Sequence, residues 1–331
     1  MGKILVTGGC GYIGSHTAVD LIENNYNVVS IDNLSNGHSI LGDGVSKITG
    51  EKYDTRCFDL TNKTSVNNFF ATENITSVIH FAAFKSVPDS VNDPISYYQN
   101  NVQSLLNVLD ASIKNGVKTF VFSSSCSVYG NPDCLPVTEE TPIKDAESPY
   151  ARTKQMCEQI CYDVAKVNPN INIIILRYFN PVGAHESGLI GDLQNKPQNL
   201  VPIITRTAIG KLEKMVVNGS DYPTRDGSCI RDYIHVMDIA NAHTKALKYK
   251  GDSNYTVFNL GSGNGVTVLE LIESFQKTTG IKLNYELGDR RPGDVIEIYS
   301  YSKKAFDELG WSIKHNVDDM MRTAWLWENN I

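Results

Sequence analysis

The sequence predicts an α/β protein built on a doubly wound parallel sheet, with a smaller lobe formed by the C-terminal part of the chain. Strand-like and helix-like segments alternate through the first half, which favours parallel strands joined by helical crossovers. Apolar runs such as Val121-Phe122 and Ile173–Leu176 lack alternation, as strands buried on both faces do. Polar or glycine-rich motifs follow several of these strands, and ligands of doubly wound sheets bind at the carboxyl ends of the strands.

The first half contains the predicted sheet. Its strands are expected at Ile4–Thr7, Val28–Asp32, a short piece near Cys57–Phe58, Ser77–Ala83, Thr119–Ser125 and Asn172–Phe179. Helices are expected between them, including Tyr12–Asn24, Pro94–Asn115 and Ser148–Asn168. Right-handed crossovers then place helices on both faces of the sheet.

The character of the sequence changes after about Pro181, where loops with Gly and Pro become frequent and fewer strands are expected. Thr267-x-x-Glu270 reads as a capping box at the start of one helix. Helices are expected at Val201–Lys211, Val236–Lys250, Val268–Thr279 and Val317–Asn329. We therefore assign residues 1–180 to the sheet domain and 181–331 mainly to the second lobe, with the chain returning to the first domain around 230–262.

A glycine motif, Gly8-x-x-Gly11-x-x-Gly14, lies between the first strand and the first helix. Glycines at this spacing let the backbone turn tightly and approach a pyrophosphate, which the helix N-terminus attracts. The second strand ends at Asp32, eighteen residues past Gly14. A carboxylate there accepts hydrogen bonds from a ribose and repels a 2′-phosphate, so the pattern favours NAD over NADP. Without that context, Asp32 would read as an ordinary turn residue.

Tyr150 and Lys154 are four residues apart and share one face of a predicted helix. A tyrosine titrates near ~10, so a phenolate near neutral pH requires a lowering of roughly three units, about 4 kcal/mol, and an adjacent ammonium favours it. Ser125, at the end of a predicted strand, has a hydroxyl suited to orient the moving proton. Alone, this spacing more often lies on a solvated helix face; beside a dinucleotide motif it predicts proton and hydride transfer at a sugar or alcohol carbon.

The composition is that of a soluble globular protein. The chain has 331 residues and a net charge of −7, which disfavours nucleic acid and anionic membrane surfaces as partners. No stretch has the apolar length of a membrane span, and the first strand begins so early that we expect no signal peptide. The seven cysteines form no C-x-x-C pair, so we expect buried free thiols, no metal and a cytoplasmic protein.

The chain resembles the extended short-chain dehydrogenase/reductase family, and within it the UDP-glucose 4-epimerases. The resemblance covers essentially the whole chain and rests on the segments VTGGCGYIGSHT, IDNLSNG, HFAAFKSV, FSSSCSVYG, SPYARTKQMCE, LRYFNPVGAH, RDYIHVMDIA and RRPGD. It implies a Rossmann domain with tightly bound NAD, a C-terminal substrate-binding lobe, and interconversion of UDP-glucose and UDP-galactose through a 4-keto intermediate. It also implies a homodimer, for which the helices at Pro94–Asn115 and Ser148–Asn168 are candidates.

The resemblance assigns roles to individual residues. Ser125, Tyr150 and Lys154 match the catalytic set, which also contacts the cofactor. The NAD-binding positions run from the pyrophosphate through the adenosine to the nicotinamide: Gly8, Gly11, Tyr12, Ile13, Gly14, Asp32, Asn33, Leu34, Ser35, Asn36, Gly37, Asp59, Leu60, Phe81, Ala82, Ala83, Lys85, Asn100 and Phe179. The substrate-binding positions are Lys85, Ser125, Tyr150, Asn180, Asn199, Leu200, Asn218, Arg231, Arg291, Asp294 and Ile298.

Two substrate positions depart from the common pattern. Asn218 lies where many relatives carry a larger apolar or aromatic residue near the uracil, so base stacking there is weakened or replaced. Ile298 lies where residue size limits the group on C2 of the sugar: tyrosine restricts the site to glucose and galactose, and a small residue admits N-acetyl sugars. Isoleucine is intermediate, which leaves activity on UDP-N-acetyl sugars open.

Other interpretations remain open at this point. A nucleotide-sugar 4,6-dehydratase needs an acid–base pair directly after Ser125, where this chain has Cys126-Ser127. A decarboxylase or a net dehydrogenase fits the downstream segments less well, and an NAD-sensing module usually lacks the Tyr or the Lys. Arg231 could equally form a surface ion pair with Asp232. His80, His235 and Asp238 are interpreted as structural residues.

Overall fold

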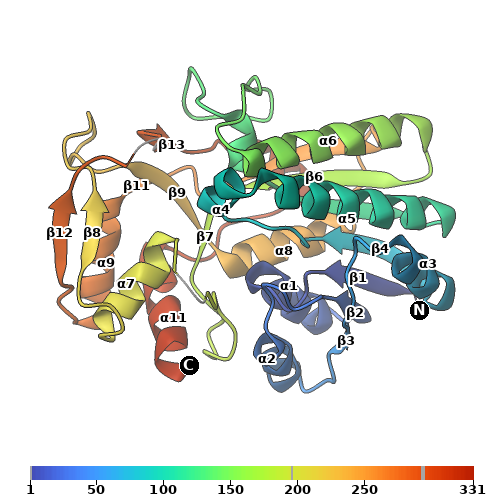
Figure 1. Cartoon of the computed structure of the whole chain (residues 1–331), viewed down its shortest axis with the longest axis horizontal. Coiled ribbons are helices and arrows are strands. Elements are labelled where there is room, and N and C mark those ends of the chain that lie inside the picture. The colour runs from blue at the N-terminus through green and yellow to red at the C-terminus, as the bar shows by residue number, and fades with distance from the viewer. Residues whose placement is uncertain (1, 195–196, 292–294) are drawn as a thin grey trace.

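A seven-stranded sheet forms the larger part of the molecule (Figure 1). The computed structural model describes residues 2–194, 197–291 and 295–331. All neighbouring strands of this sheet pair in parallel. Their spatial order is β10 (Tyr255–Leu260), β6 (Asn172–Tyr178), β5 (Thr119–Ser125), β4 (Ile75–His80), β1 (Lys3–Thr7), β2 (Val28–Ile31) and β3 (Asp54–Arg56). The order reverses between β1 and β4, so the predicted doubly wound sheet is confirmed and its switch point lies there.

Helices cover both faces of this sheet, as Figure 1 shows. One face carries α1 (Tyr12–Glu23), α2 (Ser39–Thr49) and α8 (Val236–Ala246). The other carries α3 (Lys63–Thr72), α5 (Pro94–Lys114) and α6 (Pro149–Val167), with the short α4 (Val87–Asn92) leading into α5. Two apolar cores result, one on each side of the strands.

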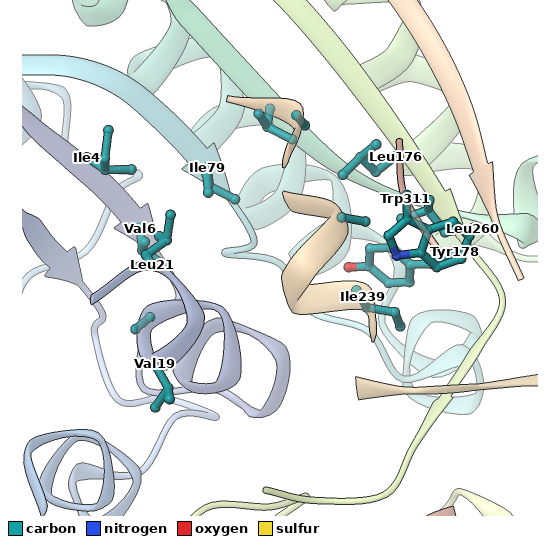
Figure 2. Packing of buried hydrophobic residues seen from close by; sticks show 14 of the residues in the cluster. Ile4, Val6, Val19, Leu21, Ile79, Leu176, Tyr178, Ile239, Leu260 and Trp311 are labelled. Atoms are coloured by element: carbon teal, nitrogen blue, oxygen red, sulfur yellow. The ribbon is translucent and has the colours of Figure 1, made fainter. Parts of the chain in front are cut away.

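The strands supply side chains to both cores in turn. In β1, Ile4 and Val6 belong to the core under α1, whereas Leu5 belongs to the core under α5. Figure 2 shows the first of these cores, in which Val6 lies near Leu21 of α1. Successive residues of a strand point to opposite faces, so a strand buried on both faces needs an unbroken apolar run. This is the physical origin of the runs in the sequence.

The element boundaries agree with the sequence in most places and differ in a few. β5 spans the predicted residues, and the short strand predicted near Cys57–Phe58 lies just before those two residues, since β3 is Asp54–Arg56. The helices α2 and α3 occupy two of the intervals in which helices were expected without assigned ranges. α2 contains Gly42 and Gly44, which disfavour a helix. It forms because the buried Leu41 and neighbouring apolar residues pack into the core that α1 also covers.

The second lobe contains short strands and a helical layer. Its sheets are formed by β7 (Asn180–Val182), β9 (Ile230–His235), β11 (Gly265–Thr267) and β13 (Glu297–Ile298), and separately by β8 (Met215–Asn218) with β12 (Tyr285–Gly288). Its helices are α7 (Leu200–Ala208), α9 (Val268–Thr279) and α11 (Val317–Asn330), while α10 (Lys303–Leu309) lies against β10. The expectation of fewer strands was wrong, because strands this short carry no long apolar run.

Several local predictions are confirmed. The capping box of Thr267 and Glu270 begins α9, and His235 accepts a hydrogen bond from the Met237 amide at the start of α8. His80 is buried in β4, where its Nδ1 lies 2.9 Å from the Thr7 hydroxyl. β10 follows α8 and forms the edge strand beside β6.

All seven cysteines are free thiols. Cys10, Cys157, Cys161 and Cys229 are buried, but Cys57 and Cys134 are exposed, so the expectation that the thiols are buried holds only in part. No helix in the described ranges is long and apolar enough to cross a membrane.

Candidate active site

The glycine loop joins β1 to α1 at the switch point of the sheet. Gly8 adopts a positive φ of 70°, and its amide donates to Ile31 O of β2 at 2.8 Å. Gly11 is the N-cap of α1 and has no side chain to cap the helix. The first amides of α1 are therefore available to an anion, where the helix dipole also favours negative charge.

Contacts around this loop explain why its residues are glycines. A Cβ on Gly14 would lie 2.2 Å from Gly8 O, and a Cβ on Gly8 would lie 3.0 Å from the Ala82 amide nitrogen. The loop is thus closed by its own backbone and by the segment after β4. Such a bare backbone cradle at a helix N-terminus fits the pyrophosphate of a dinucleotide.

Asp32 follows β2 at the same edge of the sheet. Its carboxylate accepts hydrogen bonds from the amides of Cys10 at 2.9 Å and Leu34 at 2.8 Å. A Cβ on Gly37 would lie 2.6 Å from Asp32 Oδ1, so the 32–37 loop folds back over the carboxylate. Burial raises the pKa of Asp32 and the two amides lower it. The fixed carboxylate faces the loop that would hold the ribose hydroxyls.

The remaining predicted cofactor positions lie around these two loops. Asn33 Nδ2 donates to Asp59 Oδ2 at 3.1 Å, which joins the loops after β2 and β3, and Leu60 is buried beneath them. After β4, Phe81 packs against the His243 ring at 4.6 Å. Ala83 and Lys85 continue this segment. Asn100 lies in α5, and Phe179 directly follows β6. The half-buried Ile13 lies in the first turn of α1, and Ser35 and Asn36 are exposed between Leu34 and Gly37.

Ser125, Tyr150 and Lys154 converge between β5 and α6. Ser125 is the last residue of β5, and its hydroxyl lies close enough to the Tyr150 phenol to lower the pKa of Tyr150. Lys154 is buried, donates from Nζ to Ser123 O at 2.7 Å, and lies 5.9 Å from the Tyr150 ring centroid. The tertiary structure thus joins the strand-end serine to the helical tyrosine–lysine pair.

The electrostatics of this trio differ from the simplest expectation. Burial raises the pKa of Tyr150 to about 12, although the nearby Ser125 hydroxyl lowers it. Burial likewise lowers the pKa of Lys154 to about 8, against the opposing charge of nearby acidic groups. The protein groups alone therefore do not produce the expected phenolate. A positive nicotinamide ring near Tyr150 would add the missing favourable charge.

A cavity in the second lobe reaches Tyr12 at the start of α1, whose hydroxyl donates to Gly183 O at 2.6 Å. Most of the predicted substrate positions line this one cavity: Asn180, Asn199, Leu200, Asn218, Arg231 and Arg291. They come from β7, the start of α7, the end of β8, β9 and the segment after β12. Two guanidinium groups and several amides around one cavity suit a diphosphate, which arginine recognises through paired N–H donors.

Ile298 and Phe179 lie in a small apolar cluster between the two parts of the molecule. Both are buried and pack with Val128, Tyr129 and Val137. Ile298 in β13 is paired with Arg231 in β9. Ile298 is thus held beside an arginine that lines the cavity. Asp294, the remaining predicted position, lies outside the described residues.

Asp232 does not lie on the surface, so the suggested surface ion pair between Arg231 and Asp232 is wrong. Asp232 is buried, and its carboxylate accepts hydrogen bonds from the hydroxyls of Ser262 at 2.6 Å and Ser300 at 2.7 Å. This carboxylate joins the strands around the cavity. The paired serines are far apart in the sequence, so no local pattern indicated them.

Sequence analysis also missed residues that support the site. Asn101 accepts from the Phe84 amide at 2.7 Å and donates to Phe84 O and to Thr153 Oγ1. It thereby ties the segment after β4 to α6, where Tyr150 and Lys154 lie. Gln198 and Asp192 line the cavity as well. Polar residues on the buried face of a predicted helix, as Asn101 and Asn107 are on α5, are the signal that could have revealed Asn101.

Residues 4–261 match the model of the NAD dependent epimerase/dehydratase family. The UDP-glucose 4-epimerase of Pasteurella multocida is 47% identical over 327 residues, which cover 98% of this chain and 97% of that protein.

Solved structures agree with this match. The UDP-glucose-4-epimerase of Stenotrophomonas maltophila, solved with bound NAD and formylated UDP-arabinopyranose, has a TM-score of 0.96 and 41% identity, covering 100% of this chain and 98% of that chain. The Bifidobacterium longum enzyme in complex with NAD+ and UDP has a TM-score of 0.95 and 42% identity, covering 99% and 98%. The chain therefore belongs to the NAD-dependent epimerase/dehydratase family and is an NAD-dependent enzyme of the extended short-chain dehydrogenase/reductase type, related over nearly its whole length to UDP-glucose 4-epimerases.

Proposed function

We propose that this protein interconverts UDP-glucose and UDP-galactose at C4 of the sugar, with NAD bound tightly throughout. One observation carries the proposal: the arginine-lined cavity of the second lobe reaches Tyr12, the first residue of the helix that follows the glycine loop. We infer that a hydride carrier bound along the glycine loop and a nucleotide sugar bound in the cavity meet at Ser125, Tyr150 and Lys154, which lie on β5 and α6. NAD, when bound, supplies the hydride acceptor for C4 and the donor for the return step.

The protein residues manage the proton and hold the substrate. Tyr150 accepts the proton of the sugar 4-hydroxyl, and Ser125 hydrogen-bonds the same oxygen and relays the proton. Lys154 favours the phenolate by its charge, from a position that Ser123 O holds. Asn180, Arg231 and Arg291 hold the diphosphate while the 4-keto sugar turns its other face to the site.

In this proposal, NAD and the nucleotide sugar occupy different parts of the molecule. We assign NAD to residues 1–180 with the returning 230–262 segment, and the nucleotide sugar mainly to residues 181–331. Lys85 lies at the boundary between them, since its Nζ is 3.7 Å from Asp192 of the cavity wall. Lys85 therefore contacts both ligands in this proposal.

A second question is the group on C2 of the sugar. Ile298 is buried beside Phe179 and is smaller than tyrosine, which supports activity on UDP-N-acetyl sugars in addition to UDP-glucose. Rates with UDP-N-acetylglucosamine and UDP-glucose, measured side by side, test this extension. A product only with UDP-glucose would contradict it.

The central proposal is tested without added coenzyme. Purified protein is incubated with UDP-galactose alone, and the nucleotide sugars are separated and identified. Formation of UDP-glucose supports the epimerase, because bound NAD is regenerated in each cycle. Loss of water would indicate a 4,6-dehydratase, although the positions after Ser125 are Cys126 and Ser127 in a 3-10 turn and carry no carboxylate. An unchanged substrate would indicate an NAD-binding module without catalysis.

We also propose a cytoplasmic homodimer. The seven free thiols suit a reducing compartment. On the outer side of α5 and α6, Leu106 and Met156 are 42% and 40% exposed, and the partly buried Val102 and Ile160 lie one turn away on each helix. An apolar face of this kind suits a second copy of the chain. Light scattering of the wild type and of Leu106→Glu tests the dimer, and equal masses at a monomer's value would contradict it.

A further inference from the structure

The inner face of α6 carries three ionisable residues in one stripe. Tyr150, Lys154 and Glu158 are spaced by four residues and lie one above another. They face the three consecutive serines at the end of β5. The Ser125 hydroxyl lies near the Tyr150 phenol, Ser123 O accepts from Lys154, and Ser124 Oγ donates to Glu158 Oε1. Glu158 is therefore the third member of the stripe that contains the catalytic pair.

Glu158 forms a buried ion pair with Arg177 of β6. The guanidinium donates from Nε at 3.0 Å to Oε1 and from a terminal nitrogen at 2.6 Å to Oε2. Both side chains are almost completely buried, with 4% and 6% of their surfaces exposed. Arg177 is the register partner of Ser124, so the two neighbouring strands present both groups to the same carboxylate.

The pair is completed by a hydrogen-bonded chain that leads away from the site. Arg177 also donates to the Tyr129 hydroxyl at 3.0 Å, and that hydroxyl donates to Asn259 Oδ1 at 2.6 Å. The backbone amide of Asn259 in turn donates to Glu139 Oε1 at 2.6 Å. Four segments (β6, the turn after β5, β10 and the loop before α6) therefore hold the guanidinium in one place.

The other titratable groups near the Lys154 ammonium are neutral at working pH. Burial lowers the pKa of His80 on β4 to about 3 and raises the pKa of Cys157 to about 12. It also raises the pKa of Cys161 on α6, and of Tyr178 on β6, well above the usual range. Burial likewise raises the pKa of Tyr97 on α5, which lies near Tyr150. Glu158 is thus the charged group that acts on Lys154 among these neighbours, and Arg177 is paired with its carboxylate.

The geometry points to Glu158 and Arg177 as positioning residues that act together: the neutralised pair fixes α6 against β5 and keeps an uncompensated charge from changing the electrostatic potential at Lys154 and Tyr150. This inference rests on the proposed function. With both charges present the net contribution of the pair to that potential is small. Removing one charge leaves the other uncompensated in a buried place, where it acts at short range and with little screening.

The sign of the effect depends on which partner is removed. Glu158→Gln leaves the Arg177 cation, which disfavours the Lys154 ammonium and favours the Tyr150 phenolate, so both titrations move to lower pH. Arg177→Gln leaves the Glu158 anion, so both move to higher pH. At an effective dielectric constant near 20, a charge about one helical turn away (roughly 5–6 Å) shifts a neighbouring titration by about one pH unit or more. The double variant is expected to return to the wild-type position.

The test measures the pH profile of epimerisation for the wild type, both single variants, the double variant and Arg177→Lys. Arg177→Lys keeps the charge without the planar fork, so its profile should match the wild type even where its thermal stability falls. A second readout uses no sugar: the ultraviolet difference titration of the Tyr150 phenol, with Tyr150→Phe as the blank. Thermal unfolding of every variant separates folded from unfolded samples.

Opposite shifts in Glu158→Gln and Arg177→Gln, with the double variant at the wild-type position, support the pair. Folded single variants with unmoved profiles and an unmoved phenol titration overturn it. If the single variants do not fold, the double variant and Arg177→Lys decide, since a displaced profile in either contradicts a role set by net charge. A wild type that does not epimerise overturns the proposed function instead, and the phenol titration still tests the pair.

Discussion

Replacing Lys154 with methionine tests how the site would make a tyrosine basic. Lys154 Nζ lies 5.9 Å from the Tyr150 ring centroid, so at an effective dielectric constant near 20 its charge favours the phenolate by about 3 kcal/mol, or about two pKa units. Methionine fills the same buried space without the charge. The phenol pKa of the variant should therefore rise by about two units, and the phenolate fraction below that pKa should fall about 100-fold.

The assay is the pH profile of epimerisation between UDP-galactose and UDP-glucose, together with the NAD content of the purified variant. We expect the acid limb of Lys154→Met to move up by about two units while bound NAD is retained, or activity to be lost throughout the accessible range.

The same helix offers a matched control. Tyr162 and Lys166 have the same four-residue spacing, with Lys166 Nζ 4.3 Å from the Tyr162 ring centroid, but both side chains face solvent. Lys166→Met should leave the profile unchanged. A Lys154→Met enzyme with the wild-type acid limb would refute the electrostatic role of Lys154.

Three further predictions follow from the same structure. Gly14→Ala places a Cβ 2.2 Å from Gly8 O and should abolish NAD binding, measured as NAD released from purified protein. The control Gly42→Ala, whose Cβ meets nothing nearer than 3.4 Å, should bind NAD normally. A normal NAD content in Gly14→Ala would contradict the assignment of NAD to the glycine loop. Ile298→Tyr enlarges a side chain that packs with Phe179. It should lower the rate with UDP-N-acetylglucosamine at least 10-fold more than the rate with UDP-glucose, because contacts the size of one or two methylene groups can discriminate by about that factor. Equal effects on both substrates would argue against a role for Ile298 in substrate selection. The Asp238 carboxylate raises the pKa of His315, so the pair stabilises the fold fully below about pH 6.5, and this stabilisation is lost as the pH rises through the higher folded-state pKa. In denaturant unfolding, the loss of stability between pH 6 and pH 8 should therefore be smaller in His315→Asn than in the wild type. An equal loss in both would show that this pair does not contribute.

Some helices and strands could be predicted from the sequence and others could not, and the difference has a physical reason. Long helices and fully buried strands were predicted well, because α5, α6 and β5 carry their apolar pattern within one short segment. The second-lobe strands were missed, since strands of two to six residues are stabilised by their neighbours more than by their own residues. α2 lies where a helix was expected, but its range was not assigned, because its glycines oppose a helix that tertiary packing nevertheless stabilises.

The candidate site divides in the same way. Where the chemistry is local the sequence sufficed: the glycine spacing predicted a dinucleotide cradle, and Tyr150-x-x-x-Lys154 predicted a pair on one helix face, because helical geometry alone relates residues four apart. The tertiary structure decided everything that depends on strand pairing and long-range packing. It brought Ser125 to Tyr150, assembled one cavity from β7, α7, β8 and β9, and paired Glu158 with Arg177 nineteen residues away on another element. Such contacts depend on sheet order and register, which no short stretch of sequence encodes.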